Sequence, residues 1–207
     1  MLPTDEQIRK LHQKYAHSKA DFDLIYTHCK VIDAIATQLI NVNPSITIDR
    51  DLVHVGCMLH DIGAYDVLEN GKFVRGVRHG ILGEEILQNE GYPEIISRIA
   101  SHHTGVGLTK KDVQDQNLPM PVADYTAQTD EERLIMYADK FHSKSNPPTE
   151  PPYFCTFEWY RDSISKLGSD KATKFDALAE LFSKPDLVAL SNQFNYSIKD
   201  FEVISAA

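Results

Sequence analysis

The stretch His60-Asp61-Ile62-Gly63 decides how the rest of this 207-residue sequence is interpreted. An adjacent His and Asp can present an imidazole nitrogen and a carboxylate oxygen to one point, as a divalent transition metal requires. Such a pair is common by chance, so its meaning depends on what surrounds it. Four further candidate ligands stand in predicted helices before and after the pair: His28, His79, His103 and Asp139. Together the six side chains form a candidate metal site.

The pattern around this stretch is helical almost throughout. Apolar residues recur at helical spacing from Ile8 onward, over about 21–40 and over about 49–60. Capping boxes predict the start of the first helix, at Thr4 with Gln7, and of a further helix, at Thr129 with Glu132. Helices are also predicted at about 79–90 and from Pro93 to about 103, with two or three more after the proline-rich segment 145–152. Without repeats or strand-like alternation, the sequence predicts an all-α fold.

Turn signals divide these helices. Glu69-Asn70-Gly71 predicts a turn, Gly91 a helix end, and Pro93 the first residue of a helix. Residues 104–128 predict a long, mostly irregular loop, which we expect to line the entrance to the site. Four aromatic residues follow the proline-rich segment: Phe154, Phe157, Trp159 and Tyr160. We expect them to dock a C-terminal helix onto the bundle. The alternative is that they cap a base or sugar of a ligand.

Length and composition indicate one globular domain with a C-terminal extension. Hydrophobic residues make up 42% of the chain and charged residues 25%. The net charge of −9 argues against a nucleic-acid polymer as partner, because such partners require a basic surface. A small anionic substrate stays compatible with this charge, since local cations or a metal can override it.

The sequence contains no signal peptide and no apolar run approaching the ~20 residues of a membrane span. We therefore expect a cytoplasmic protein that does not associate with membranes. Three cysteines show no disulfide spacing, and we expect Cys29 and Cys57 to be buried thiols.

The ligand types indicate the class of metal. Imidazole nitrogens with carboxylate oxygens suit Fe, Mn, Zn, Co or Ni better than Mg or Ca. Four histidines and two aspartates would overfill one ion but suit two. Predicted helices that each supply one inward ligand are typical of metal sites in the core of a helical bundle.

The order of these motifs resembles the HD superfamily of metal-dependent hydrolases, and specifically its HDIG-type members. The resemblance covers roughly residues 20–145. It implies an HD-type metal-binding helical domain over residues 1–145, followed by a proline-rich linker and C-terminal helices over 146–207 that pack on the same domain. Some segments look similar to small uncharacterised HDIG proteins and to bacterial hydrolases that split diadenosine tetraphosphate symmetrically. Five motifs carry the resemblance: Thr27-His28-Cys29, Leu59-His60-Asp61-Ile62-Gly63, Arg78-His79-Gly80, Ser101-His102-His103-Thr104-Gly105 and Tyr137-Ala138-Asp139-Lys140.

The resemblance also assigns roles. Asp61 would be the catalytic residue that bridges two divalent ions, with Fe or Mn preferred and Zn, Co or Ni as further candidates. One ion would also be held by His28, His60 and Asp139. The other ion would also be held by His79 and His103. The neighbouring His102 competes with His103, but the family's His-Thr-Gly pattern falls on His103. We expect His102, and Glu84 in the preceding helix, to orient a metal-bound imidazole.

The chain departs from the family pattern at Ala64, where many phosphohydrolases of the family carry Lys or Arg to meet a phosphate. Arg78 is our first candidate to replace that cation, because the guanidinium fork suits phosphate. Other candidates are Arg75, Lys110 and Lys140.

Three functions follow from the resemblance. The leading hypothesis is hydrolysis of a phosphoester or phosphoanhydride in a small nucleotide-like molecule by a metal-activated hydroxide. A di-iron oxygenase that cleaves a C–C or C–P bond is the second, and the absent cation at Ala64 keeps it open. A non-catalytic nucleotide sensor is the third. The sequence leaves open whether the chain forms a homodimer.

Overall fold

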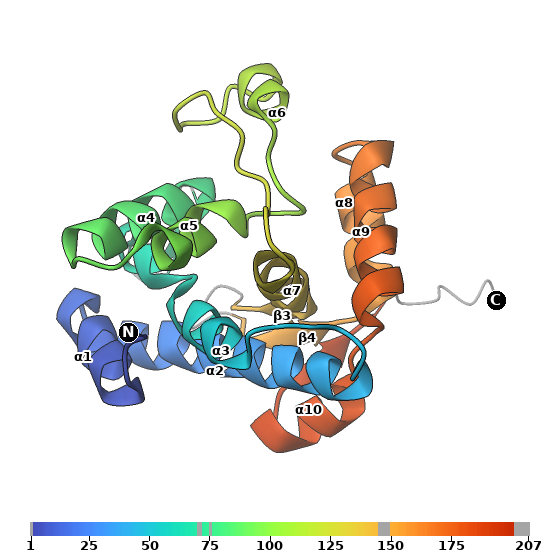
Figure 1. Ribbon diagram of the computed structural model, residues 1–207, viewed down its shortest axis with the longest axis horizontal. Helices are drawn as coiled ribbons and strands as arrows, with labels where there is room; N and C mark the ends of the chain where they lie inside the picture. The colour runs from blue at the N-terminus through green and yellow to red at the C-terminus, as the bar shows by residue number, and fades with distance from the viewer. Residues whose placement is uncertain (1, 70–71, 75, 145–149, 201–207) are drawn as a thin grey trace.

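The computed structural model describes residues 2–69, 72–74, 76–144 and 150–200. They form a helical bundle, which confirms the all-α prediction (Figure 1). The helices of the first half are α1 (Asp5–Tyr15), α2 (Lys19–Val42), α3 (Arg50–Leu59), α4 (His79–Asn89) and α5 (Glu94–His102). Those of the second half are α6 (Lys110–Asp115), α7 (Asp130–Ala138), α8 (Phe157–Ser165), α9 (Ser169–Phe182) and α10 (Leu187–Phe194). Short 3-10 turns occupy η1 (Ile62–Val67), η2 (Gly76–Arg78) and η3 (Asp139–Phe141).

Five short strands were not predicted. β1 (Leu68–Glu69) and β2 (Lys72–Phe73) form an antiparallel pair. β3 (His142–Ser143) pairs antiparallel with β4 (Tyr153–Cys155), which pairs in parallel with β5 (Ser197–Lys199). These strands are too short to show an alternating pattern, so periodicity alone does not reveal them.

The long helix α2 lies at the centre of the packing, in contact with α3, α7 and α10 (Figure 1). Its buried face carries Ile25, Ile32 and Ile35, each fully inaccessible to solvent. α4 packs against both α5 and η1. Gly63 in η1 lies so close to α4 that a Cβ atom there would overlap the backbone of Gly83 and the carbonyl of His79.

The predicted helix boundaries mostly hold. Both predicted capping boxes are present, at Thr4 and at Thr129. The segment 104–128 is less irregular than predicted, because a third capping box at Thr109 starts α6 and a bridge joins Leu108 to Tyr125. Pro93 occupies the capping position before α5 rather than its first turn. Asn70 and Gly71 of the predicted turn, and residues 145–149 of the proline-rich segment, lie outside the described residues.

The C-terminal helices contact the bundle through aromatic side chains. Phe175 of α9 stacks on Phe157 at a centroid distance of 4.8 Å and lies 5.3 Å from the ring of Tyr137 in α7. The hydroxyl of Tyr137 donates to the carbonyl of Ser183 at 2.9 Å. Phe157 therefore docks α8 on α9, as does Tyr160, whose ring centroid lies 4.9 Å from that of Phe175. Trp159 and Tyr160 also line a cavity described below.

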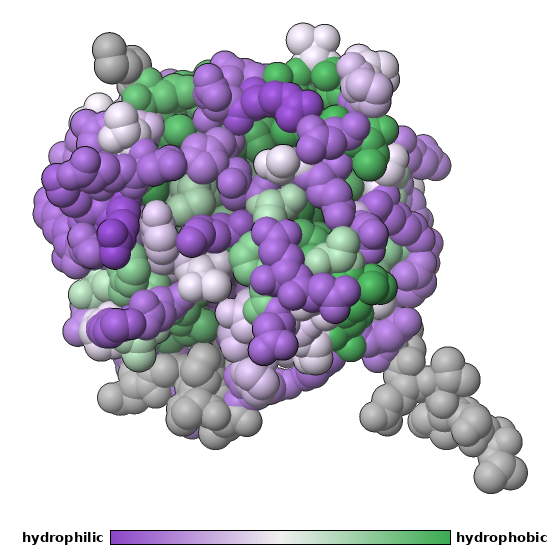
Figure 2. Space-filling model, turned by 90° about the horizontal axis from the view of Figure 1, so that it is seen from below, coloured by the Kyte–Doolittle hydropathy of each residue, from purple (hydrophilic) through white to green (hydrophobic). Residues whose placement is uncertain are grey.

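Hydrophilic residues cover much of the face shown in Figure 2, and hydrophobic residues appear among them in separate patches. Among the described residues, no helix combines the length and apolar character needed to cross a bilayer. Cys29 and Cys57 are buried free thiols, as predicted.

Candidate metal centre

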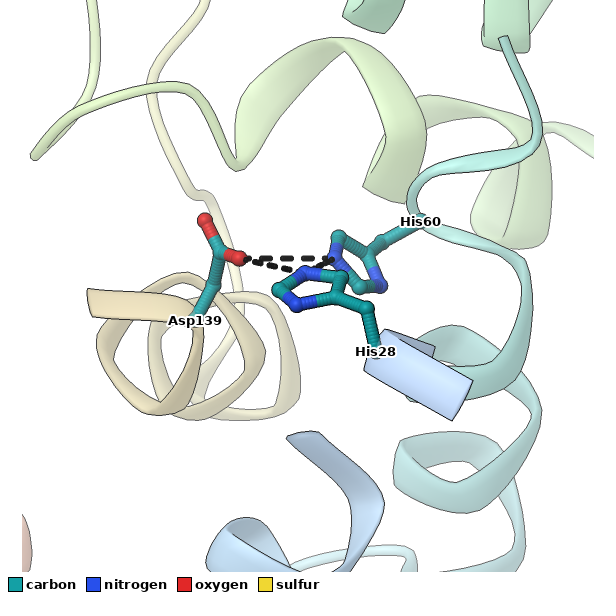
Figure 3. Close-up of side chains that lie close together, drawn as sticks. All are labelled: His28, His60 and Asp139. Carbon is teal, nitrogen blue, oxygen red and sulfur yellow. Dashed lines mark hydrogen bonds and ion pairs between the residues drawn. The ribbon is translucent and has the colours of Figure 1, made fainter. Parts of the chain in front are cut away.

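One group of side chains joins α2 to the ends of α3 and α7. His28 on α2, His60 after α3 and Asp139 after α7 point toward one another (Figure 3). The Nε2 atoms of the two histidines are 3.3 Å apart, and Asp139 Oδ1 lies 3.1 Å and 3.5 Å from them. Ligand atoms about 2.1 Å from one ion are separated by roughly 3.0–3.4 Å in tetrahedral or octahedral geometry. The three atoms could therefore hold one ion.

A second group lies on the other side of Asp61. Its Oδ1 atom is 3.3 Å from His79 Nε2 and 3.7 Å from His103 Nε2, and these two nitrogens are 2.8 Å apart. The other carboxylate oxygen, Oδ2, lies 3.3 Å from His28 Nε2 and 3.7 Å from His60 Nε2. The Asp61 carboxylate thus stands between the two groups and turns one oxygen to each.

Helix ends bring these ligands together. His60, His103 and Asp139 are the residues that cap the C-termini of α3, α5 and α7. The C-terminus of a helix carries a partial negative charge, because its last carbonyl groups have no partner within the helix. Three such ends directed at one place favour a bound cation.

Backbone carbonyls orient three of the four imidazoles. His60 Nδ1 donates to Cys57 O at 2.7 Å and His103 Nδ1 donates to Ala100 O at 2.7 Å. His79 Nδ1 donates in the same way to the carbonyl of the residue three positions earlier. A carbonyl can only accept, so each Nδ1 carries hydrogen, and in the neutral ring Nε2 keeps a lone pair for a metal.

This arrangement fits a metal ion. The Nε2 atoms of His79 and His103 face each other at 2.8 Å, and in neutral rings neither has a hydrogen to share. Asp61 Oδ1 is buried and has no hydrogen-bond partner among the described residues. Lone pairs converging on a buried carboxylate oxygen repel one another unless a cation lies among them.

The surroundings also set the ionisation of the ligands. Burial lowers the pKa of His28 to about 4 and holds the pKa of His103 well below its ordinary value, so both rings are neutral at pH 7. Burial would raise the pKa of Asp61, but the Lys144 ammonium and the nearby imidazoles outweigh it and keep the carboxyl ionised. Burial likewise opposes a charge on His60, yet Asp61 and a neighbouring carboxylate raise its pKa. The negative charge that stabilises a proton on His60 would also stabilise a metal cation at this centre.

The cations predicted to meet a substrate lie in different surroundings. Lys140 is buried, and its Nζ donates to Asp139 Oδ2 at 2.6 Å and to the carbonyl of His103 at 3.1 Å. Arg78 is partly buried directly before α4, and Lys110 is exposed at the start of α6. No hydrogen bond or ion pair joins Arg78 or Lys110 to a candidate ligand among the described residues, and Arg75 lies outside them.

The two residues expected to orient an imidazole do not contact one. His102 Nδ1 lies 2.8 Å from Ser101 Oγ and 3.0 Å from the carbonyl of Arg98. Glu84 accepts a hydrogen bond from Gln88 at 3.2 Å, within its own helix. The groups that accept hydrogen bonds from the Nδ1 atoms and orient the rings are backbone carbonyls. Which carbonyl lies near a given ring depends on where each helix ends.

Two residues beside the centre were missed or left undecided. Lys144 donates through Nζ to Asp61 Oδ2, and nothing in the motif pattern singles it out. On the sequence alone, His142 could equally face the cavity of Asp139 or lie in solvent. In the structure it is buried, and its Nδ1 lies 2.8 Å from His28 Nδ1. Its position three residues after Asp139 was the available signal.

A cavity of about 380 Å³ opens beside Asp139. Its cationic lining residues are Lys140 and Lys144, and aromatic rings from β2, β4 and α8 form much of its wall. Ala64 is buried and contributes no charge here. The segment 104–128, expected at the entrance, supplies none of the residues that line this cavity. The lining residues beyond position 150 are Tyr153, Cys155, Trp159 and Tyr160.

Residues 15–144 match the model of the family described as the HD domain. The chain is 35% identical over 121 residues to a tRNA (cytidine(56)-2'-O)-methyltransferase of Picrophilus torridus, an alignment that covers 58% of this chain and 32% of that protein. It is 33% identical over 117 residues to an uncharacterised protein of Methanocaldococcus jannaschii, covering 56% and 64%. The alignments thus span less than two thirds of these curated relatives.

Solved structures show the same fold. The HD domain of the L. monocytogenes phosphodiesterase PgpH superposes with a TM-score of 0.52 at 18% identity, covering 93% of this chain and 100% of that domain. A second structure of that domain, in complex with cyclic-di-AMP, superposes with a TM-score of 0.52 at 20% identity, covering 93% and 99%.

Proposed function

The chain belongs to the HD-domain family, and on this basis we propose that it is a metal-dependent phosphohydrolase. Its substrate would be a small nucleotide-like phosphoester or phosphoanhydride. A phosphodiesterase domain with the same fold supports the reaction class, and the cyclic-di-AMP in one structure of that domain supports a nucleotide-like ligand.

We assign two metal ions to the centre, with Fe or Mn preferred. His28, His60 and Asp139 would hold one, His79 and His103 the other, and Asp61 would bridge them. One observation carries this assignment: the two oxygens of Asp61 each lie 3.3 Å from the nearest histidine of a different group. When bound, two such ions generate a hydroxide nucleophile at neutral pH and neutralise charge on the phosphoryl group.

The protein's own residues prepare this chemistry. Lys140 holds Asp139 through its second oxygen, which leaves Oδ1 turned toward His28 and His60. The carbonyls behind His60 and His103 fix their rings with Nε2 inward. The adjacent cavity, with its cationic and aromatic lining, gives a small anionic molecule room beside Asp139.

The direct test is metal analysis of protein purified without chelator, followed by a phosphatase and phosphodiesterase panel with Mn or Fe added under nitrogen. We expect bound metal and release of phosphate or a nucleotide product. Asp61→Ala should abolish metal binding and turnover while circular dichroism shows an intact bundle. Asp66→Ala, an exposed carboxylate in η1, is the matched control and should keep both.

The same panel separates the alternatives. Oxygen consumption with bound iron, and no hydrolysis under nitrogen, would identify the oxygenase instead. Tight nucleotide binding by metal-loaded protein without turnover of any substrate would identify the sensor. Full hydrolytic activity in Asp61→Ala would refute the proposed role of the centre.

A further inference from the structure

We propose that Lys144 binds the phosphoryl group of the substrate and takes the place of the cation that the chain lacks at Ala64. The inference rests on the proposed function and names one residue of that same site. Lys144 directly follows β3, far in sequence from Ala64, yet its Nζ donates to Asp61 Oδ2. Ala64 lies three residues after Asp61, and its backbone N–H donates to the Asp61 carbonyl at 2.9 Å.

Lys144 reaches the centre and the cavity at once. Its Nζ donates to Asp61 Oδ2, and its side chain lines the cavity beside Asp139. The ammonium also lies 5.7 Å from the centroid of the Phe73 ring in the cavity wall. The side chain keeps 18% of its surface exposed, so solvent or a ligand can reach it.

The other cations are less suited to this role. Lys140 lines the same cavity, but it is only 6% exposed and already donates to Asp139 and to a carbonyl. An ammonium has three donors, and for Lys144 a single acceptor, Asp61, is identified among the described residues. Lys144 therefore has donors left for the oxygens of a phosphoryl group.

The charges around the cavity favour an anion. Asp61 and Asp139 are each paired with a lysine, so the two carboxylates are balanced before any metal ion is counted. Divalent ions at the centre would add positive charge that only an anionic ligand could neutralise. Among the described lining residues, the carboxylate outside the centre belongs to Glu150, which is paired with Lys199.

The test compares Lys144→Met, which keeps most of the side-chain length but removes the charge, with Lys144→Arg and the control Lys111→Met, at an exposed lysine of α6. Titration calorimetry measures Mn²⁺ binding first, and then inorganic phosphate binding to the Mn-loaded protein. We expect Lys144→Met to bind Mn²⁺ at least as well as the wild type, because a cation competing for Asp61 is gone. Its phosphate affinity should fall by about tenfold or more. Lys144→Arg should recover most of that affinity, and Lys111→Met should lose none.

Two results would overturn the inference. One is a Lys144→Met variant that binds both Mn²⁺ and phosphate like the wild type. The other is a variant that loses Mn²⁺, which would mean that Lys144 only supports Asp61. The readout is independent of turnover, so phosphate binding that depends on Lys144 would stand even if the panel of phosphoesters finds no substrate.

Discussion

The imidazoles of His28 and His142 face each other with their Nδ1 atoms 2.8 Å apart and their ring centroids 5.1 Å apart. Between two neutral rings, only one of these nitrogens can carry the shared hydrogen. If His28 binds a metal through Nε2, its hydrogen is on Nδ1 and His142 accepts it. His142 then carries its own hydrogen on Nε2, which is buried without a partner among the described residues. His142 thus does for His28 what a carbonyl does for the other three histidines.

This relationship predicts how substitutions of His142 affect metal affinity. In His142→Leu the acceptor is lost, and the affinity for Mn²⁺ should fall by about 10–100-fold. His142→Asn should keep most of the affinity, because its side-chain oxygen can occupy the place of Nδ1. Calorimetric titration with Mn²⁺ measures both. His102→Leu removes a buried histidine that contacts no ligand and should leave the affinity unchanged; equal losses in both leucine variants would show a packing effect only.

Removing one histidine of the second group should change the metal count. His103→Ala leaves His28, His60 and Asp139 in place, so we expect the bound metal to fall from two ions per chain to one. Elemental analysis of the purified variant, normalised to protein concentration, gives the number. A variant that still holds two ions would exclude His103 as a ligand.

The contact between η1 and α4 predicts a steric effect at Gly63. In Gly63→Ala the new methyl group would overlap the backbone of Gly83 and the carbonyl of His79, and backbone cannot move aside as a flexible side chain can. We expect a loss of about 3 kcal/mol in the free energy of unfolding, together with weaker metal binding as His79 shifts. Urea denaturation measures the first effect. Gly76→Ala is the control, since its Cβ would lie 3.9 Å from Phe73 Cβ; an equally stable Gly63→Ala would contradict the packing described here.

His54 predicts a pH dependence that is independent of the metal centre. Its hydrogen bond to Asp33 at 3.0 Å, aided by Asp5 at 2.8 Å, raises its pKa from 6.5 to about 9 although partial burial lowers it. The raised pKa stabilises the folded state fully below pH 6.5, and this contribution is lost as the pH rises toward 9. The side chain is 38% exposed, so solvent screening keeps the effect small.

Urea denaturation of the wild type and His54→Gln at several pH values tests this. The stability advantage of the wild type should shrink as the pH rises from about 6.5 to 9. Asp33→Asn should remove most of that trend. A constant difference between the wild type and His54→Gln across this range would mean that the ion pairs do not form in solution.

Sequence reasoning succeeded where a local pattern carries the information. Helix starts at Thr4 and Thr129 follow from capping boxes, whose partners lie three residues apart. The approach of His28, His60 and Asp139 could be expected from the family order of motifs, although no local pattern encodes their distances.

It failed where the information is non-local. Lys144 and Asp61 stand 83 positions apart, and their ion pair depends on how β3 leaves η3. Glu84 was expected to orient an imidazole because carboxylates commonly do so. In the structure, backbone carbonyls near helix ends orient the imidazoles instead. Because every residue has a carbonyl, the residue types in the sequence do not indicate which carbonyl will orient a ring.

The wall of the cavity beside Asp139 has a consequence for comparing this chain with others. Every proposed ligand lies inside residues 15–144, the part shared with the family, whereas Tyr153, Trp159 and Tyr160 lie beyond it. The proposed metal ligands are thus encoded within the family region, whereas part of the cavity wall is encoded after it. Two homologues that share all six proposed metal-binding positions can therefore differ in this part of the cavity wall, and a comparison of their sequences after position 150 would show that difference.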